Sequence, residues 1–179
     1  MTIWFSADMH CYHENIIKFC NRPFVNSMEM TETIIANHNR LVKPTDMVYW
    51  LGDIAWNMSP DIFEQLVKRF NGKKHLILGN HDNKKMIYKC KKELFTHISD
   101  VWELNYNRNL IFMSHYPHVS WPSSFHGSWM LHGHTHGKLV DRTDIKRLDV
   151  GVDVHKFCPI SIEQVEQIMH NKIVSDKQL

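Results

Sequence analysis

Three histidines lie within five positions of LHGHTHG, the segment at residues 131–137. Successive side chains of an extended chain point to opposite faces, so His132, His134 and His136 would share a face if one strand ran through all three. Glycines at 133 and 137 favour a turn instead. Imidazole nitrogens are common metal ligands. The segment therefore indicates a metal site, provided that other segments supply partners.

Further candidate ligands follow four other apolar segments of the chain. They are Asp8 with His10, Asp53, Asn80 with His81, and His115. A Gly-Asp or Gly-Asn pair after a strand is by itself most often only a turn. The same placement recurs five times, however, and ligands of open α/β sheets bind at the carboxyl ends of strands. We therefore expect the five segments to deliver these side chains to one place.

The strands that would position these residues are short and apolar. Strands are predicted at 3–5, 47–51 and 75–78, and the last two end at glycines. Residues 101–106 and 110–114 flank Asn107, Arg108 and Asn109 as the arms of a hairpin would. Further strands are predicted at 128–131 and 148–152. Strands and helices alternate over the first half of the chain, which favours an α/β fold.

Helices are predicted from apolar residues at helical spacing. One contains Ile34, His38 and Leu41, and the last one carries Ile162, Val165, Ile168 and Met169 on a single face. The clearest helix lies between them, with Ser59 as its cap, Pro60 in its first turn and Gly72 after its end.

The donor set indicates which metals would bind. Without His81, the side chains that follow the strands are two carboxylates, four imidazoles and an amide: Asp8, Asp53, His10, His115, His134, His136 and Asn80. This set suits borderline divalent ions such as manganese, iron or zinc better than Cu(I) or an iron–sulfur cluster. Seven ligands are too many for one tetrahedral site. They suit two ions about 3.5–4 Å apart that share a carboxylate.

Five motifs resemble, in order, the signature blocks of the calcineurin-like metallophosphoesterases: Asp8-x-His10, Gly52-Asp53, Gly79-Asn80-His81-Asp82, Ser114-His115 and Gly133-His134-Thr135-His136. The segment LDVGVD at 148–153, followed by a proline and a helix, resembles compact members that lack a cap domain. The resemblance implies a four-layer α-β-β-α sandwich in which two mixed β-sheets pack face to face. It also implies one metallophosphoesterase domain over residues 1–179.

The resemblance assigns a role to each motif. It implies that Asp8, His10 and His136 hold one metal ion. It implies that Asn80, His115 and His134 hold a second ion and that Asp53 bridges the two. Manganese is the expected metal, with iron, zinc and nickel as alternatives. His81 would stabilise charge on the phosphate or protonate the leaving oxygen, and Asp82 would orient it. His132 falls on a position without a ligand role and would be a sheet residue.

Phosphoester hydrolysis is the expected reaction, because two cations neutralise phosphate oxygens and activate a bridging water. A phosphodiesterase acting on small nucleotides or nucleic-acid ends is the first hypothesis. A phosphomonoesterase is the second. The third is a non-catalytic interaction scaffold on the same fold, which the presence of His81 and of every ligand disfavours.

Two groups of residues bear on the substrate. Lys85, Lys89 and Lys92 would share one face of a helix, either as a solvated surface or as a cradle for further phosphates. Tyr116, Trp121, Phe125 and Trp129 follow His115. These aromatic residues would either stack on a base or pack the core.

Composition excludes several other classes of protein. The chain has 179 residues, of which 43% are hydrophobic and 22% charged, as expected for one globular domain. A net charge of +2 is too small to indicate the pronounced basic surface of most nucleic-acid-binding proteins. Cys11, Cys20, Cys90 and Cys158 lack the spacing of a zinc ribbon or redox motif. The start of the chain has no secretory leader and no segment suits a membrane span, so we expect a cytoplasmic enzyme without an obligate protein partner.

Overall fold

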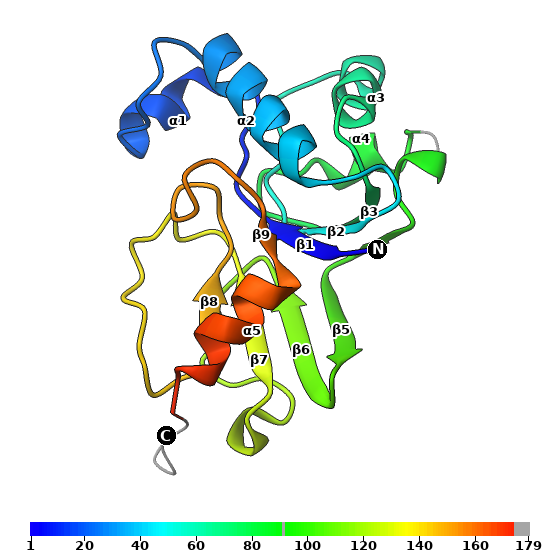
Figure 1. Cartoon of the computed structure of the whole chain (residues 1–179). Coiled ribbons are helices and arrows are strands. Elements are labelled where there is room, and N and C mark those ends of the chain that lie inside the picture. The colour runs from blue at the N-terminus through cyan, green and yellow to red at the C-terminus, as the bar shows by residue number, and fades with distance from the viewer. Residues whose placement is uncertain (91, 174–179) are drawn as a thin grey trace.

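The structure is a computed structural model that describes residues 1–90 and 92–173. Its first sheet has five strands in the order β4-β3-β2-β1-β9 (Figure 1). The first four strands in that order are parallel to their neighbours, and β9 is antiparallel to β1. The strands are β1 (Ile3–Ser6), β2 (Met47–Trp50), β3 (Lys73–Ile77), β4 (His97–Ser99) and β9 (Ile160–Ser161).

The second sheet has four strands in the order β5-β6-β7-β8. The predicted hairpin forms its antiparallel half, and β6, β7 and β8 run parallel. The strands are β5 (Val101–Tyr106), β6 (Asn109–Ser114), β7 (Trp129–His132) and β8 (Arg147–Asp149). Both sheets are therefore mixed, as predicted.

The two sheets share one apolar core. Tyr49 and Ile77 of the first sheet belong to the same buried cluster as Met113 and Leu131 of the second. Helix α5 (Ile162–His170) adds Val165 to this cluster and begins with a capping box at Ser161. Burial of alternate residues on facing strands is what holds two sheets together.

Four helices cover the other face of the first sheet (Figure 1): α1 (Glu14–Phe19), α2 (Ser27–Leu41), α3 (Pro60–Lys68) and α4 (Lys84–Ile87). Ile34 and Phe63 of these helices pack against Trp50 of the sheet in a second core. Side chains cap three of these helices, because Asn26 accepts from the amide of Glu29, Ser59 from that of Ile62 and Asn83 from that of Met86.

The outer face of the second sheet is covered by loops and one short helix. Phe112 and Met130 point away from the core between the sheets and pack with Trp121. The 3-10 helix η2 (Ser124–His126) lies in the same connecting segment, between β6 and β7. The predicted fold class, an α/β sandwich with two mixed sheets, is confirmed.

Some boundaries differ from the prediction. The strand expected at 148–152 ends at Asp149, because the chain then leaves the second sheet and Gly151 pairs with Ala7 next to the first. The strand expected at 128–131 lies at 129–132 and so includes His132. Strands β4 and β9 and helix α1 are too short for periodicity to reveal.

No helix within residues 1–90 and 92–173 combines the length and the hydrophobicity that a membrane span requires.

Candidate metal centre

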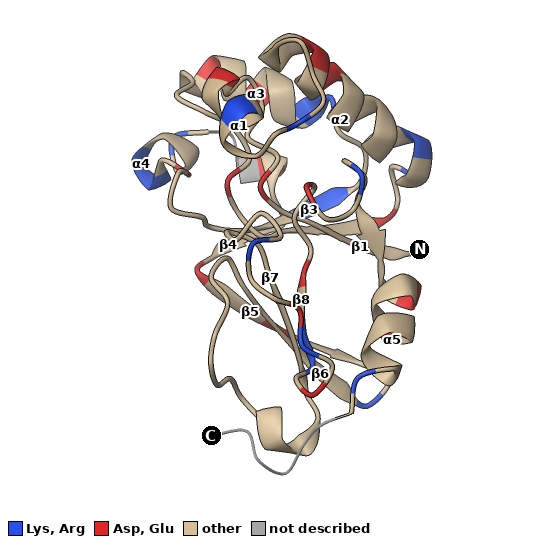
Figure 2. Ribbon diagram, turned by 90° about the vertical axis from the view of Figure 1, so that its left-hand side faces the viewer, with Lys and Arg blue, Asp and Glu red and all other residues tan. Residues whose placement is uncertain are grey.

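The structure brings all seven predicted ligands to one edge of the two sheets. Asp8 and His10 follow β1, Asp53 follows β2, and Asn80 follows β3; His115 follows β6, and His134 and His136 follow β7. The loops also bind one another, since the amide of Asp8 donates to Gly52 and that of Gly133 to His115. In Figure 2 several acidic segments (red) lie on loops between the helical layer and the second sheet.

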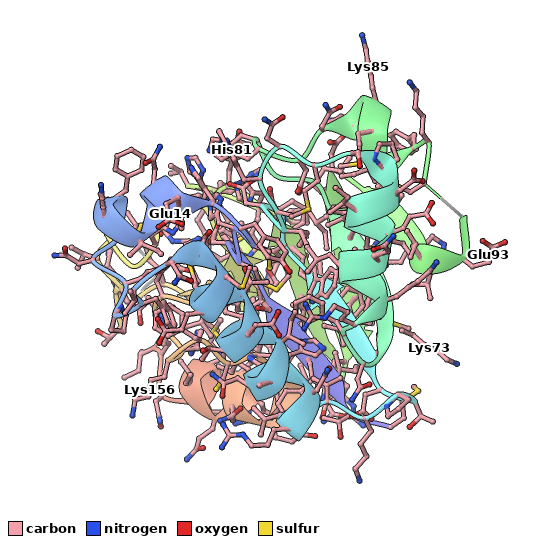
Figure 3. All side chains as sticks on the ribbon, turned by 90° about the horizontal axis from the view of Figure 1, so that it is seen from above. Glu14, Lys73, His81, Lys85, Glu93 and Lys156 are labelled. Carbon is pink, nitrogen blue, oxygen red and sulfur yellow. The ribbon has the colours of Figure 1, made fainter. Side chains whose placement is uncertain are left out.

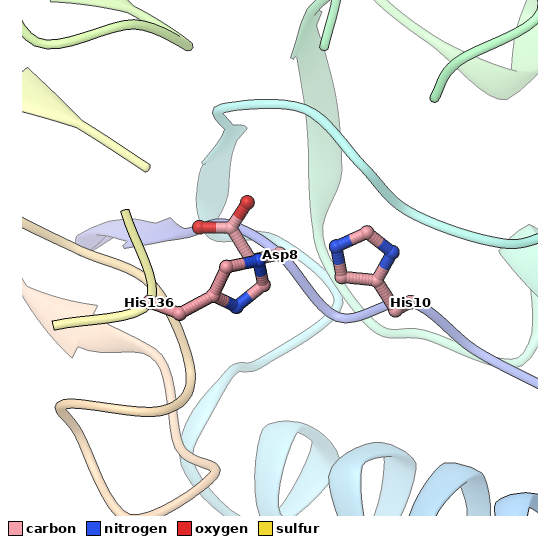
Figure 4. A group of neighbouring side chains, drawn as sticks. All are labelled: Asp8, His10 and His136. Atoms are coloured by element: carbon pink, nitrogen blue, oxygen red, sulfur yellow. The ribbon is translucent and has the colours of Figure 1, made fainter. Parts of the chain in front are cut away.

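Asp8, His10 and His136 form the first group of predicted ligands (Figure 4). One donor atom from each lies within 4.8 Å of the other two. Both oxygens of the buried Asp8 carboxylate accept from the amide of His134, at 3.0 and 2.8 Å. The Asp8 carboxylate is therefore held in place by the loop that carries His134 and His136.

Asn80, His115 and His134 form the second group. The Asn80 Oδ1 atom lies 2.9 Å from Nε2 of His115 and 2.9 Å from Nδ1 of His134. The two imidazole rings are 5.1 Å apart between centroids. Three donor atoms from three different loops thus converge.

Asp53 lies between the two groups. Its Oδ2 atom is 3.5 Å from Nε2 of His10 and 3.5 Å from Nε2 of His115. Its Oδ1 atom accepts from the amide of His81 at 2.8 Å. This carboxylate therefore faces one histidine of each group.

The lone pairs of these rings fit a cation. His115 Nδ1 lies 2.7 Å from the carbonyl oxygen of Leu51, so in the neutral ring Nδ1 carries the proton and Nε2 the lone pair. That lone pair faces Asn80 Oδ1, which is also an acceptor. Both ring nitrogens of His10 are buried without a hydrogen-bond partner in the described part of the chain. Unpartnered buried acceptors are costly, and bound metal ions would satisfy them.

Electrostatics favour the same reading. Burial raises the pKa of Asp8 well above its ordinary value, and the nearby carboxylates of Asp149 and Asp53 raise it further. Burial, then His136, lowers the pKa of His10 to about 2. Burial and His115 lower the pKa of His134. The imidazoles of His10 and His134 are thus held in the neutral form that binds metals, beside a carboxylate that a cation would stabilise.

Five of the seven ligand positions have a left-handed backbone. A positive φ is uncommon in residues other than glycine, and such strained positions cluster at functional sites. The residues are Asp8 (57°), His10 (49°), Asp53 (57°), His134 (69°) and His136 (49°). Glycine allows the close packing of these loops: a Cβ at Gly133 would lie 2.6 Å from the Asp8 carboxylate.

Comparison with known proteins places the chain in a family. A family model described as calcineurin-like phosphoesterase matches residues 1–176. The chain belongs to this family. The uncharacterized protein MJ1445 of Methanocaldococcus jannaschii is similar, with 31% identity over 173 residues that cover 93% of this chain and 90% of that protein.

Two further similarities come from a phage and a solved structure. The Gene 66 protein of Mycobacterium phage L5 is 25% identical over 179 residues, which cover 84% of this chain and 86% of the phage protein. The solved structure of AQ665 from Aquifex aeolicus, a protein of unknown function, superimposes with a TM-score of 0.75 at 26% identity and covers 93% of this chain and 98% of that one. Membership of the calcineurin-like phosphoesterases implies a phosphoester substrate and a site for divalent metal ions.

The calcineurin-like site has supporting residues that sequence reasoning missed. Asp153 Oδ2 accepts from Nδ1 of His136 at 2.7 Å, which leaves Nε2 of that ring for a metal ion. The guanidinium of Arg22 donates to Asp153 and also to the carbonyl oxygens of Asp8 and Met9. Although burial opposes ionisation, the bonds from His136 and Arg22 hold the pKa of Asp153 below its ordinary value.

Asp149 supports the same loop from the other side. Its Oδ2 atom accepts from Oγ1 of Thr135 at 2.7 Å and from the amide of Gly137 at 3.1 Å. Asp149 and Asp153 both lie in the LDVGVD segment, whose resemblance to the family could have indicated their roles. No sequence motif marks Arg22.

Asp82 holds the main chain of the Asp53 loop. Its carboxylate accepts from the amides of Gly79 and Asp53 at 2.9 Å and of Ile54 at 3.1 Å. These bonds differ from the expected one to the His81 ring. Asp82 instead fixes the backbone that presents Asp53.

His81 is exposed beside the first group of ligands. Its ring centroid lies 5.4 Å from that of His10 and 5.0 Å from that of Trp56. His132, as predicted, is a buried sheet residue, and its Nδ1 atom lies 2.8 Å from the carbonyl oxygen of Gly133. The three histidines of the LHGHTHG segment therefore divide two to one.

The lysine prediction is wrong in its geometry. Helix α4 ends at Ile87, and Lys92 begins the separate 3-10 helix η1 (Lys92–Leu94), so Lys85, Lys89 and Lys92 share no helical face. Figure 3 shows Lys85 projecting outward from α4, away from His81. This arrangement favours the solvated-surface alternative.

The aromatic residues after His115 divide between core and surface. Trp121 and Trp129 are buried, which is the packing alternative. Phe125 is exposed. Tyr116 is 47% exposed, and its ring lies 4.6 Å from that of His134, at the rim of the site.

Proposed function

We propose that this protein is a hydrolase with two divalent metal ions that cleaves phosphodiester bonds in small nucleotides or at nucleic-acid ends, and that residues 1–179 form one such domain. The observation that carries the proposal is the position of Asp53, whose Oδ2 atom is 3.5 Å from a histidine of each ligand group. A carboxylate between two groups of oxygen and nitrogen donors is the arrangement that a pair of cations requires.

Each of the two groups of candidate ligands would hold one metal ion. Asp8, His10 and His136 would hold one ion, Asn80, His115 and His134 the other, and Asp53 both. Manganese is the first metal to test, followed by iron, zinc and nickel, because oxygen and imidazole donors suit these ions. When bound, the pair would supply positive charge for the phosphate oxygens and lower the pKa of a bound water.

The chain's own residues would orient the reaction. Asp153 holds His136 in one tautomer and Asp82 holds the Asp53 loop. His81 would give a proton to the leaving oxygen, since its ring is exposed beside His10 and its amide is fixed by Asp53. An alkoxide leaving group needs this proton more than a phenolate does.

Diester hydrolysis is favoured over monoester hydrolysis by the openness of the site. His81 is exposed and Tyr116 is half exposed at the opposite rim, so a substrate can extend on both sides of its phosphate. A monoester has a group on only one side.

The test is a comparison of two chromogenic esters. Purified protein with manganese should hydrolyse bis-(p-nitrophenyl) phosphate with a higher kcat/KM than p-nitrophenyl phosphate. The reverse order would replace the proposal with the phosphomonoesterase. Absence of turnover with manganese, iron, zinc and nickel alike, in protein shown to bind metal, would favour the scaffold.

A further inference from the structure

A cavity of about 400 Å³ adjoins the candidate metal centre on the side of His81. Asn80 and His81 form part of its wall, so the cavity begins where the proposed ligands end. Trp56, Met58, Phe63 and Met86 form an apolar part of the lining. A cavity of this size is within the range that binds small organic ligands.

Trp56 is held in place before any ligand arrives. Its amide donates to the carbonyl oxygen of Cys11 at 3.2 Å, and Cys11 and Ala55 form a β-bridge. Its indole stacks on the buried His13 ring, with 4.1 Å between centroids and 6° between planes. The indole is nevertheless 40% exposed. A planar surface is thus fixed on one side and open on the other.

We propose that this cavity binds the purine or pyrimidine base of the leaving nucleoside, with Trp56 as its stacking surface. The inference rests on the proposed diesterase activity and names the group that departs. His81 stands between the ligands and the cavity and would protonate the leaving oxygen, so the group beyond it is the leaving group. Base stacking on an aromatic side chain tolerates any base sequence.

The chemistry of the lining favours a base over a further phosphate. Among the described residues that line the cavity there is no lysine or arginine, while Asp82 contributes a carboxylate. A phosphate group would therefore meet no lysine or arginine cation there. Asn57 and Asn83 also line the cavity, and the amide group of an asparagine can both donate to and accept from the edge of a base.

Two diesters that differ only in the leaving group test the proposal. One is dithymidine monophosphate, which releases thymidine, and the other is a methyl ester of thymidine monophosphate of matching orientation, which releases methanol. Trp56→Ala should lower kcat/KM for the dinucleotide about 5- to 100-fold and change that for the methyl ester less than about 2-fold. Trp56→Phe should restore most of the loss. Tyr116→Ala, at the other rim, is the matched aromatic control and should not discriminate between the two leaving groups.

The outcomes separate this inference from the diesterase proposal. Equal losses on both diesters in Trp56→Ala would mean that the indole only supports His13 and His81, and would overturn the base subsite. If the wild-type protein cleaves monoesters and neither diester, the diesterase proposal is wrong, and the base subsite that rests on it is wrong as well. A second readout needs no turnover: added thymidine should shift the indole N–H resonance of Trp56, assigned from Trp56→Phe, whereas ribose should not. No shift at saturating thymidine would also count against the subsite.

Discussion

The guanidinium of Arg22 binds both carboxylate oxygens of Asp153, 131 positions further along the chain, at 2.8 Å each. Both side chains are almost fully buried. The same Arg22 donates to the main chain of the Asp8 loop, and the same Asp153 accepts from His136. One ion pair therefore connects two of the loops that carry candidate ligands.

Removal of Arg22 should cost far more stability than removal of an exposed arginine. Arg22→Gln would leave the Asp153 charge buried without its partner, which typically costs about 3–5 kcal/mol. Arg69→Gln is the matched control, because Arg69 also binds a carboxylate through two nitrogens, that of Glu32, but at the surface. Its loss should cost less than about 1 kcal/mol. Urea unfolding of the metal-free proteins measures both, and equal small effects would contradict a structural role for the buried pair.

Sequence reasoning predicted that the candidate ligands converge because their signal is local. Asp8, Asp53 and His134 each follow a strand that its apolar residues identify, and parallel topology then brings the strand ends together. The pair of Arg22 and Asp153 depends on a contact between distant segments, which no local pattern encodes. Strand β9 (Ile160–Ser161) was missed because two residues carry no periodicity.

The hydrogen bonds of Asp82 show a second kind of contact that the sequence did not predict. Its position in the motif suggested a side-chain partner, His81. Its carboxylate instead accepts from three backbone amides, and backbone direction depends on loop conformations that the sequence does not reveal. In the same way, the three lysines after His81 were placed on one helix that in fact ends at Ile87.

Metal content should respond differently to two ligand changes. Protein reconstituted with manganese should contain close to two ions per chain. Asp53→Asn should lower occupancy at both positions, because the carboxylate faces both groups, whereas His10→Ala should remove mainly one ion. Elemental analysis after dialysis measures the count. A single ion in the saturated wild-type protein, or equal mild losses in both variants, would reject the bridging arrangement.

Acid should destabilise the protein through His38, which lies away from the candidate ligands. Burial lowers its pKa from 6.5 to about 4, and its Nε2 atom lies 3.0 Å from the carbonyl oxygen of Asn71. Between these two values the unfolded chain binds the proton and the folded one does not, so the free energy of unfolding falls as pH falls from 6.5 towards 4. The contribution of His38 to the free energy of unfolding is complete above pH 6.5 and is lost below pH 4, a difference of about 3 kcal/mol.

His38→Gln tests that assignment because it removes the titrating group and keeps a donor for Asn71. Unfolding of metal-free protein should show a shallower decline between pH 6.5 and 4 than in the wild type. His126→Gln, at an exposed histidine, should leave the decline unchanged. Parallel curves for the wild type and His38→Gln would place the acid sensitivity elsewhere.

The role of His81 can be separated from metal binding by the leaving group. His81→Ala should keep the fold and the metal content, because the ring lies beside His10 and outside both ligand groups. It should lower kcat for a nucleotide diester about 10²–10⁴-fold, the usual effect of losing a general acid. Bis-(p-nitrophenyl) phosphate should be affected far less, since p-nitrophenolate departs without a proton. Equal losses on both substrates with metal retained would assign His81 to phosphate binding, and loss of metal would make it a ligand.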